Sequence, residues 1–99
     1  MKTVLISDNI DTLLGLKMVG VDGVLATNAE QVSAHFLRFT KDKNVGLILI
    51  TEIANEMCAD MINSYKAGNR FPLISVVPGR DKPKESTGSV ADYFNDAVL

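Results

Sequence analysis

Acidic and hydroxyl side chains follow two of the apolar segments that the sequence predicts to be strands. Ser7, Asp8 and Asp11 come after the first apolar run, and Thr51 with Glu52 comes after the third. Doubly wound sheets bind ligands at the carboxyl ends of their strands, so a reactive site is expected in these two loops. Clustered carboxylates in such a loop could hold Mg²⁺ and support phosphoryl transfer.

This phosphoryl-transfer hypothesis lacks its central residue. A phosphate-accepting receiver module needs an aspartate at the end of the third strand and a lysine after a fifth strand. Thr51 occupies the position of that aspartate, and the sequence has no fifth apolar run. Asp8 and Asp11 could only mimic the acidic cluster, so a degenerate receiver-like signalling module of flavodoxin-like fold stays open as an alternative. The simpler interpretation is that Asp8 and Thr51 cap helices.

The sequence contains no motif for other catalytic or cofactor chemistry. Neither GxGxxG nor GxxxxGK[ST] occurs, and an acidic loop after the first strand disfavours phosphate. Cys58 falls in an apolar helical stripe, which favours a core position, although a small flavodoxin-like enzyme using this thiol is a further hypothesis. His35 lies beside Arg38 and away from the stripe of Phe36 and Phe39, which indicates a solvated surface residue. We therefore expect no catalytic residue, metal site or cofactor.

The order of the apolar segments predicts an α/β fold. Four runs rich in Val, Ile and Leu cover residues 3–7, 23–27, 45–51 and 72–77. They do not alternate with polar residues, which is typical of parallel strands buried on both faces. Stretches of helical period separate them and predict right-handed crossovers. We expect a four-stranded parallel sheet of flavodoxin-like or Rossmann-like order 2-1-3-4, with helices on both faces.

The first predicted helix follows the first strand. Asp8 or Asn9 can cap its start, and Gly20 can end it. Its apolar positions at helical spacing predict one inward face, made of Ile10, Leu13, Leu14 and Met18.

Two further helices are predicted between the later strands. Asn28 and Gln31 form a possible capping box at the start of the second helix, which ends before residue 41. The third helix is predicted as one unbroken stretch over residues 52–68, with Met57 and Cys58 packing in its apolar stripe.

The composition changes after residue 78, so we expect a globular part over residues 1–78 and an appended segment. Residues 79–88 hold two Gly and five charged residues, which predicts an exposed, mobile linker. Residues 89–99 return to helical spacing and predict a C-terminal amphipathic helix that is too short to be stable alone. Its stripe must dock on the sheet or on a partner, and the candidate partner-binding residues are Val90, Tyr93, Phe94, Ala97 and Val98.

The overall composition narrows the class of partner. The chain is 46% hydrophobic and 22% charged with a net charge of -2, the balance of an ordinary globular domain. It has no basic field for nucleic acid, and its apolar runs are too short to cross a bilayer. A single cysteine and the lack of a signal-like start favour a reducing, cytoplasmic setting. We expect no nucleic-acid partner, no membrane insertion and no small-molecule substrate.

Four segments of the chain form a set whose order and spacing are fairly specific. Residues 6–20 give a strand end, an acidic turn and a helix that ends at a glycine. Residues 42–54 give an apolar strand that ends in Thr51-Glu52 and enters a helix, and residues 72–79 give a fourth strand that ends at a proline. With the C-terminal amphipathic stretch, these segments resemble the F-subunit family of the V-type and A-type rotary ATPases, and the likeness covers nearly the whole chain.

The resemblance implies a non-catalytic rotor subunit of the central stalk. Such a subunit binds the coiled-coil stalk subunit inside the catalytic hexameric head, while other chains carry out the ATP chemistry. It would help to couple ATP hydrolysis or synthesis to proton or sodium transport, from the cytoplasmic side of the membrane.

Overall fold

The computed structural model describes residues 1–78. The predicted linker over residues 79–88 and the predicted helix over residues 89–99 lie outside the described residues. The described elements follow in the order β1 (Lys2–Ser7), α1 (Ile10–Lys17), β2 (Asp22–Leu25), α2 (Ala29–Thr40), β3 (Val45–Thr51), α3 (Glu52–Met57), α4 (Ala59–Gly68) and β4 (Leu73–Val77).

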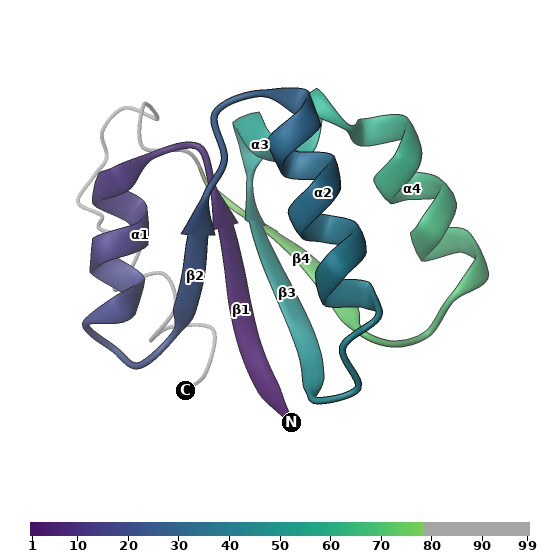
Figure 1. The fold of residues 1–99 in the computed structure, drawn as a ribbon, viewed down its shortest axis with the longest axis horizontal. Helices are drawn as coiled ribbons and strands as arrows, with labels where there is room; N and C mark the ends of the chain where they lie inside the picture. The colour runs from purple at the N-terminus through teal and green to yellow at the C-terminus, as the bar shows by residue number, and fades with distance from the viewer. Residues whose placement is uncertain (79–99) are drawn as a thin grey trace.

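The four strands form one parallel sheet in the order β2-β1-β3-β4. α1 covers one face of this sheet, whereas α2, α3 and α4 lie on the other (Figure 1). The predicted fold class, a flavodoxin-like parallel sheet with helices on both faces, is therefore confirmed for the described part of the chain.

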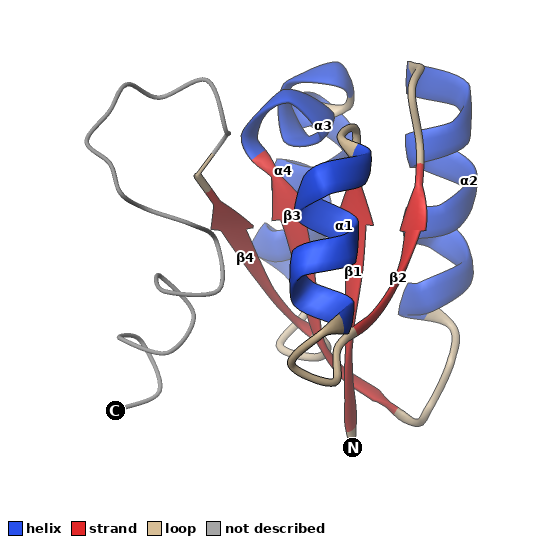
Figure 2. Ribbon diagram, turned by 90° about the vertical axis from the view of Figure 1, so that its left-hand side faces the viewer, coloured by secondary structure: helices blue, strands red, loops and turns tan. Residues whose placement is uncertain are grey.

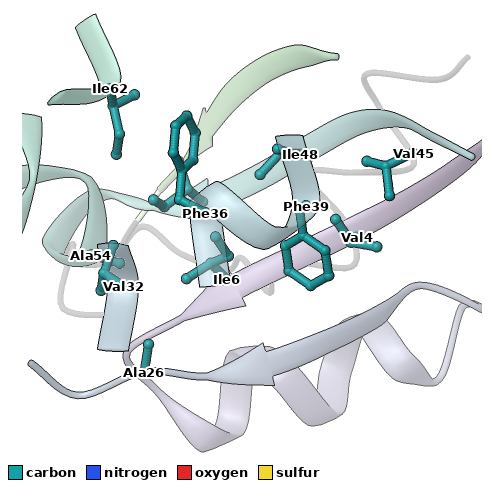
Figure 3. Packing of buried hydrophobic residues seen from close by; sticks show 11 residues of the cluster. Val4, Ile6, Ala26, Val32, Phe36, Phe39, Val45, Ile48, Ala54 and Ile62 are labelled. Atoms are coloured by element: carbon teal, nitrogen blue, oxygen red, sulfur yellow. The ribbon is translucent and has the colours of Figure 1, made fainter. Parts of the chain in front are cut away.

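The face of the sheet that carries α2, α3 and α4 is called the first face, and these three helices cover it. Phe36 of α2 is fully buried, and its ring meets that of Tyr65 from α4 edge-on at a centroid distance of 5.5 Å. Figure 3 shows Phe36 and Phe39 lying over apolar side chains of β1 and β3, among them Val4 and Ile48. Continuous burial of these side chains explains why the strands read as unbroken apolar runs.

Within residues 1–78, α1 is the one helix on the second face (Figure 2). It packs on β1 and β2, where Leu13 and Leu16 join a second buried cluster with Leu5. The close approach depends on Gly23 of β2. A Cβ atom at Gly23 would lie 2.7 Å from Leu13 Cδ1 and 2.9 Å from the backbone oxygen of Leu5.

Gly20 closes the turn that follows α1, in agreement with its predicted role in ending this helix. This glycine has φ +93, a left-handed conformation that side-chain-bearing residues rarely adopt. Its N–H donates to the carbonyl of Lys17 at 3.0 Å, and the N–H of Val21 donates to the carbonyl of Leu16 at 3.0 Å. This pair of bonds is the Schellman closure, which brings the chain directly into β2.

The prediction of one unbroken third helix is wrong, because the helix breaks at Cys58. Its backbone angles, φ -133 and ψ 36, leave the helical region, and α3 ends while α4 begins at the next residue. The break allows α3 to continue from the end of β3 while α4 takes a different direction (Figure 1). In that direction Tyr65 reaches Phe36, so tertiary packing overrides the continuous helical period.

The predicted inward face of α1 is also wrong in part. Leu13 is buried as expected, but Ile10, Leu14 and Met18 are exposed, and Leu16 is buried in their place. The contact at Gly23 fixes the rotation of the helix, because Leu13 must lie over this glycine.

Substitution of Gly23 by alanine tests this contact. We expect Gly23→Ala to lower the free energy of unfolding by about 1–3 kcal/mol, because the added methyl group overpacks the helix against the strand. Urea denaturation followed by circular dichroism measures the change. Gly15→Ala is the matched control, because a Cβ atom there meets nothing within 4 Å. This helical substitution should gain up to about 1 kcal/mol, and an equal loss at both positions would contradict the packing of α1 on β2.

Candidate functional site

The loops after β1 and β3 meet through a direct hydrogen bond. Thr51 Oγ1 donates to Asp8 Oδ1 at 2.6 Å, and the backbone N–H of Asp8 donates to Thr51 Oγ1 at 3.3 Å. Beside them, Ser7 Oγ donates to the carbonyl of Asn9 at 2.7 Å and accepts from the Asn9 N–H at 2.9 Å. Ser7 and Thr51 are both buried. The structure thus brings Asp8 and Thr51 together, and hydrogen bonds within the two loops engage the hydroxyl groups of Ser7 and Thr51. Asp11 lies in the first turn of α1 and Glu52 in the first turn of α3.

The prediction that Asp8 and Thr51 cap helices is wrong. Asn9 caps α1, because its Oδ1 accepts from the N–H of Thr12 at 3.0 Å. Thr51 precedes α3 but makes no side-chain capping bond, since its hydroxyl is directed across the sheet to Asp8. The predicted cap of α2 by Asn28 is confirmed, because Asn28 Oδ1 accepts from the N–H of Gln31 at 2.8 Å. The second bond of the predicted capping box differs, because Gln31 Oε1 accepts from the N–H of Thr27 at 2.8 Å.

The geometry gives the receiver-like alternative no further support. Among residues 1–78, no three His, Cys, Asp or Glu side chains come together in a way that could hold a metal ion. At the position of a phosphate-accepting carboxylate, the Thr51 hydroxyl instead donates to Asp8. The arrangement can join two strand ends firmly, and this is the role that its contacts indicate.

Cys58 and His35 take structural positions. The Cys58 thiol is half-buried, donates to the carbonyl of Ala29 at 3.3 Å and packs against the main core cluster, as predicted. His35 lies at the surface, as predicted, but it is half-buried and its ring stacks on Phe39. Burial, and next the charge of Arg38, lower the pKa of His35. The neutral ring accepts a hydrogen bond from Arg38 Nη2 at its Nδ1, at 2.9 Å.

A row of apolar side chains runs along the outer side of α1. Ile10, Leu14 and Met18 are 51%, 52% and 86% exposed, and we call these three residues the outer α1 stripe. Their spacing of four residues places them in one row along the helix. This second apolar row is visible in the sequence, because Ile10, Leu14 and Met18 follow one another at intervals of four residues. The row that packs on the sheet is a different one and contains Leu13 and Leu16.

A second apolar area lies on the sheet beyond α1. Leu47 of β3 pairs in register with Leu73 of β4, so both point to the face that carries α1. Leu47 is half-buried and Leu73 is 56% exposed, while α1 packs mainly on β1 and β2. We call Leu47 and Leu73 the open sheet half. Together with the outer α1 stripe it makes this side of the molecule the candidate interaction surface. The predicted partner-binding residues, Val90, Tyr93, Phe94, Ala97 and Val98, lie outside the described residues and stay a prediction.

The fold and this surface define a small flavodoxin-like protein whose described residues offer apolar contact area. A family model described as "ATP synthase (F/14-kDa) subunit" matches residues 3–94, and the chain belongs to this family of rotary ATPase subunits. No curated protein matches the chain in sequence. None of the helices within residues 1–78 has the length and apolar character to span a membrane.

The bond between Thr51 and Asp8 can be tested by removing the hydroxyl group. We expect Thr51→Val to lower the free energy of unfolding by about 1.5–3 kcal/mol, because a hydrogen bond to a carboxylate is lost. A double-mutant cycle with Asp8→Ala should show coupling, measured by urea denaturation. Thr40→Val, which removes an exposed hydroxyl from the end of α2, should change stability by less than about 0.5 kcal/mol. Additive losses in the cycle would show that the bond contributes nothing.

Proposed function

We propose that the chain is a non-catalytic rotor subunit in the central stalk of a V-type or A-type ATPase or ATP synthase. The match of the family model over residues 3–94 carries this proposal. In this role the chain binds the coiled-coil stalk subunit and contacts the catalytic hexameric head. It helps to couple ATP hydrolysis or synthesis to proton or sodium transport, and it works on the cytoplasmic side of the membrane without entering it.

The contacts of the described residues support a mechanical role over a chemical one. Hydrogen bonds within the chain engage the hydroxyls of Ser7 and Thr51, at the sheet edge where a ligand would bind in this class of fold. Nucleotide chemistry is therefore assigned to other subunits. What this chain offers is a rigid sheet, apolar contact surface on the side of α1, and the predicted C-terminal helix.

The predicted C-terminal stripe, Val90, Tyr93, Phe94, Ala97 and Val98, is proposed to face the stalk. An amphipathic helix that lays such a stripe into a groove between helices is a common mode of recognition. The sequence places no charged residue within this stripe. Burial of its aromatic side chains would supply a large part of the binding free energy.

Co-expression with the coiled-coil stalk subunit from the same genome neighbourhood tests the function. We expect a stable one-to-one complex, measured by size-exclusion chromatography with light scattering. Charging the stripe with Phe94→Glu and Val98→Glu should weaken it, whereas Asn95→Glu, a change off the stripe, should not. A chain that stays monomeric beside a folded stalk subunit would contradict the proposed function. If Phe94→Glu and Val98→Glu leave the complex as stable as that of the unmodified chain, the proposed function stands and the stripe is excluded from the interface.

A further inference from the structure

The charged side chains of residues 1–78 separate by sign between the two ends of the sheet. Because the strands are parallel, their carboxyl ends, α3 and the starts of the other helices lie at one edge, the upper edge in Figure 1. The charged residues at that edge are carboxylates: Asp8, Asp11, Glu30, Glu52, Glu56 and Asp60. Exposed cations gather at the opposite edge, and we call this set the basic pole: Lys2, Lys17, Lys41, Lys43, Lys66 and Arg70.

Helix dipoles explain only a part of this separation. A cation in the last turn of a helix is stabilised by the dipole, and Lys17 and Lys66 are in last turns. In contrast, Lys2, Lys43 and Arg70 lie outside the helices and their caps. They extend the basic pole along the starts of β1, β3 and β4, beyond what the stability of the helices requires.

The cations of the basic pole are available to a partner. Each of these side chains is exposed, and none shares an ion pair with a carboxylate of residues 1–78. Of the carboxylates at the same edge, Asp42 accepts a hydrogen bond from the backbone N–H of Asn44 at 2.9 Å, and Asp22 is exposed. The net charge of -2 for the whole chain therefore conceals a positively charged end, to which a negatively charged surface is attracted.

We propose that the basic pole docks on an acidic surface of the coiled-coil stalk subunit, formed by Asp and Glu side chains. This inference rests on the proposed function and adds the charge of the partner surface. A protein surface fits better than a phosphate backbone or an anionic membrane, because it can place a cation opposite the exposed Asp22. Complementary charges steer association and fix orientation, so the basic pole determines which end of the chain meets the stalk.

Neutralisation of the basic pole in the full chain tests this inference. At about 0.15 M salt, we expect Lys41→Gln with Lys43→Gln to weaken binding to the stalk subunit about threefold to tenfold. The affinity of this variant should also depend less on sodium chloride concentration than that of the unmodified chain. Surface plasmon resonance at several salt concentrations measures both effects, and circular dichroism verifies that each variant folds.

The matched control changes the net charge equally at another place. Asn63→Glu with Ser64→Glu adds two negative charges at exposed positions in the middle of α4, away from the edge that carries the basic pole. Salt screens charges beyond about 8 Å at this ionic strength, so the control should leave the affinity within about twofold. Equal weakening by both double variants would show that net charge alone acts, and the inference would fail.

The other outcomes separate the inference from the proposed function. If the unmodified chain binds the stalk subunit with an affinity that neither salt nor Lys41→Gln with Lys43→Gln changes, the inference fails while the proposed function stands. If the unmodified chain does not bind the folded stalk subunit, both fail. If the lysine variant binds the stalk subunit normally but no longer binds phosphatidylserine vesicles or duplex DNA that the unmodified chain binds, the basic pole serves a phosphate-bearing partner and the inference is overturned.

Discussion

A parallel sheet with apolar side chains on both faces must be covered on both, and this constraint shapes the whole chain. Three helices bury the first face around Phe36. On the second face the described residues supply α1 alone, which packs on β1 and β2. The close approach of α1 at Gly23 sets its rotation, turning Leu13 inward and leaving Leu14 outside. The outer α1 stripe and the open sheet half therefore both follow from the uneven cover of one sheet.

The same sheet also explains how polar residues of the loops after β1 and β3 come together. Adjacent parallel strands bring Asp8 and Thr51 to one edge, where a ligand would bind in this fold. Their hydrogen bond satisfies a buried hydroxyl and ties the two strand ends together. A subunit that transmits force between partners needs a stiff body more than a reactive centre, so this bond fits the proposed mechanical role.

Much of the fold could be predicted from the sequence because its signals are local. The apolar run of β3 was predicted at Val45–Thr51, and the left-handed glycine at Gly20 marked the end of α1. The break at Cys58 could not be predicted, because the helical period continues through it and the contact of Tyr65 with Phe36 decides the direction of α4. The choice of Asn9 as the cap, and of Thr51 as the partner of Asp8, likewise depends on strand pairing.

The candidate interaction surface on the side of α1 was not predicted, for a related reason. The candidate residues from Val90 to Val98 were chosen because their spacing is helical, but α1 shows that spacing alone does not distinguish an inner from an outer row. Leu14 and Leu13 are equally apolar, and only the glycine on the neighbouring strand determines which of them is buried.

A rotor subunit turns with the stalk, and covalent linkage within the assembled ATPase is the sharpest test of this proposed role. In a Cys58→Ser background, one engineered disulfide would join an exposed residue of the chain to the stalk subunit. A second would join another exposed residue of the chain to the hexameric head. We expect ATP hydrolysis to continue with the first disulfide and to stop with the second until a reductant is added. Unchanged hydrolysis with the chain linked to the head would contradict it.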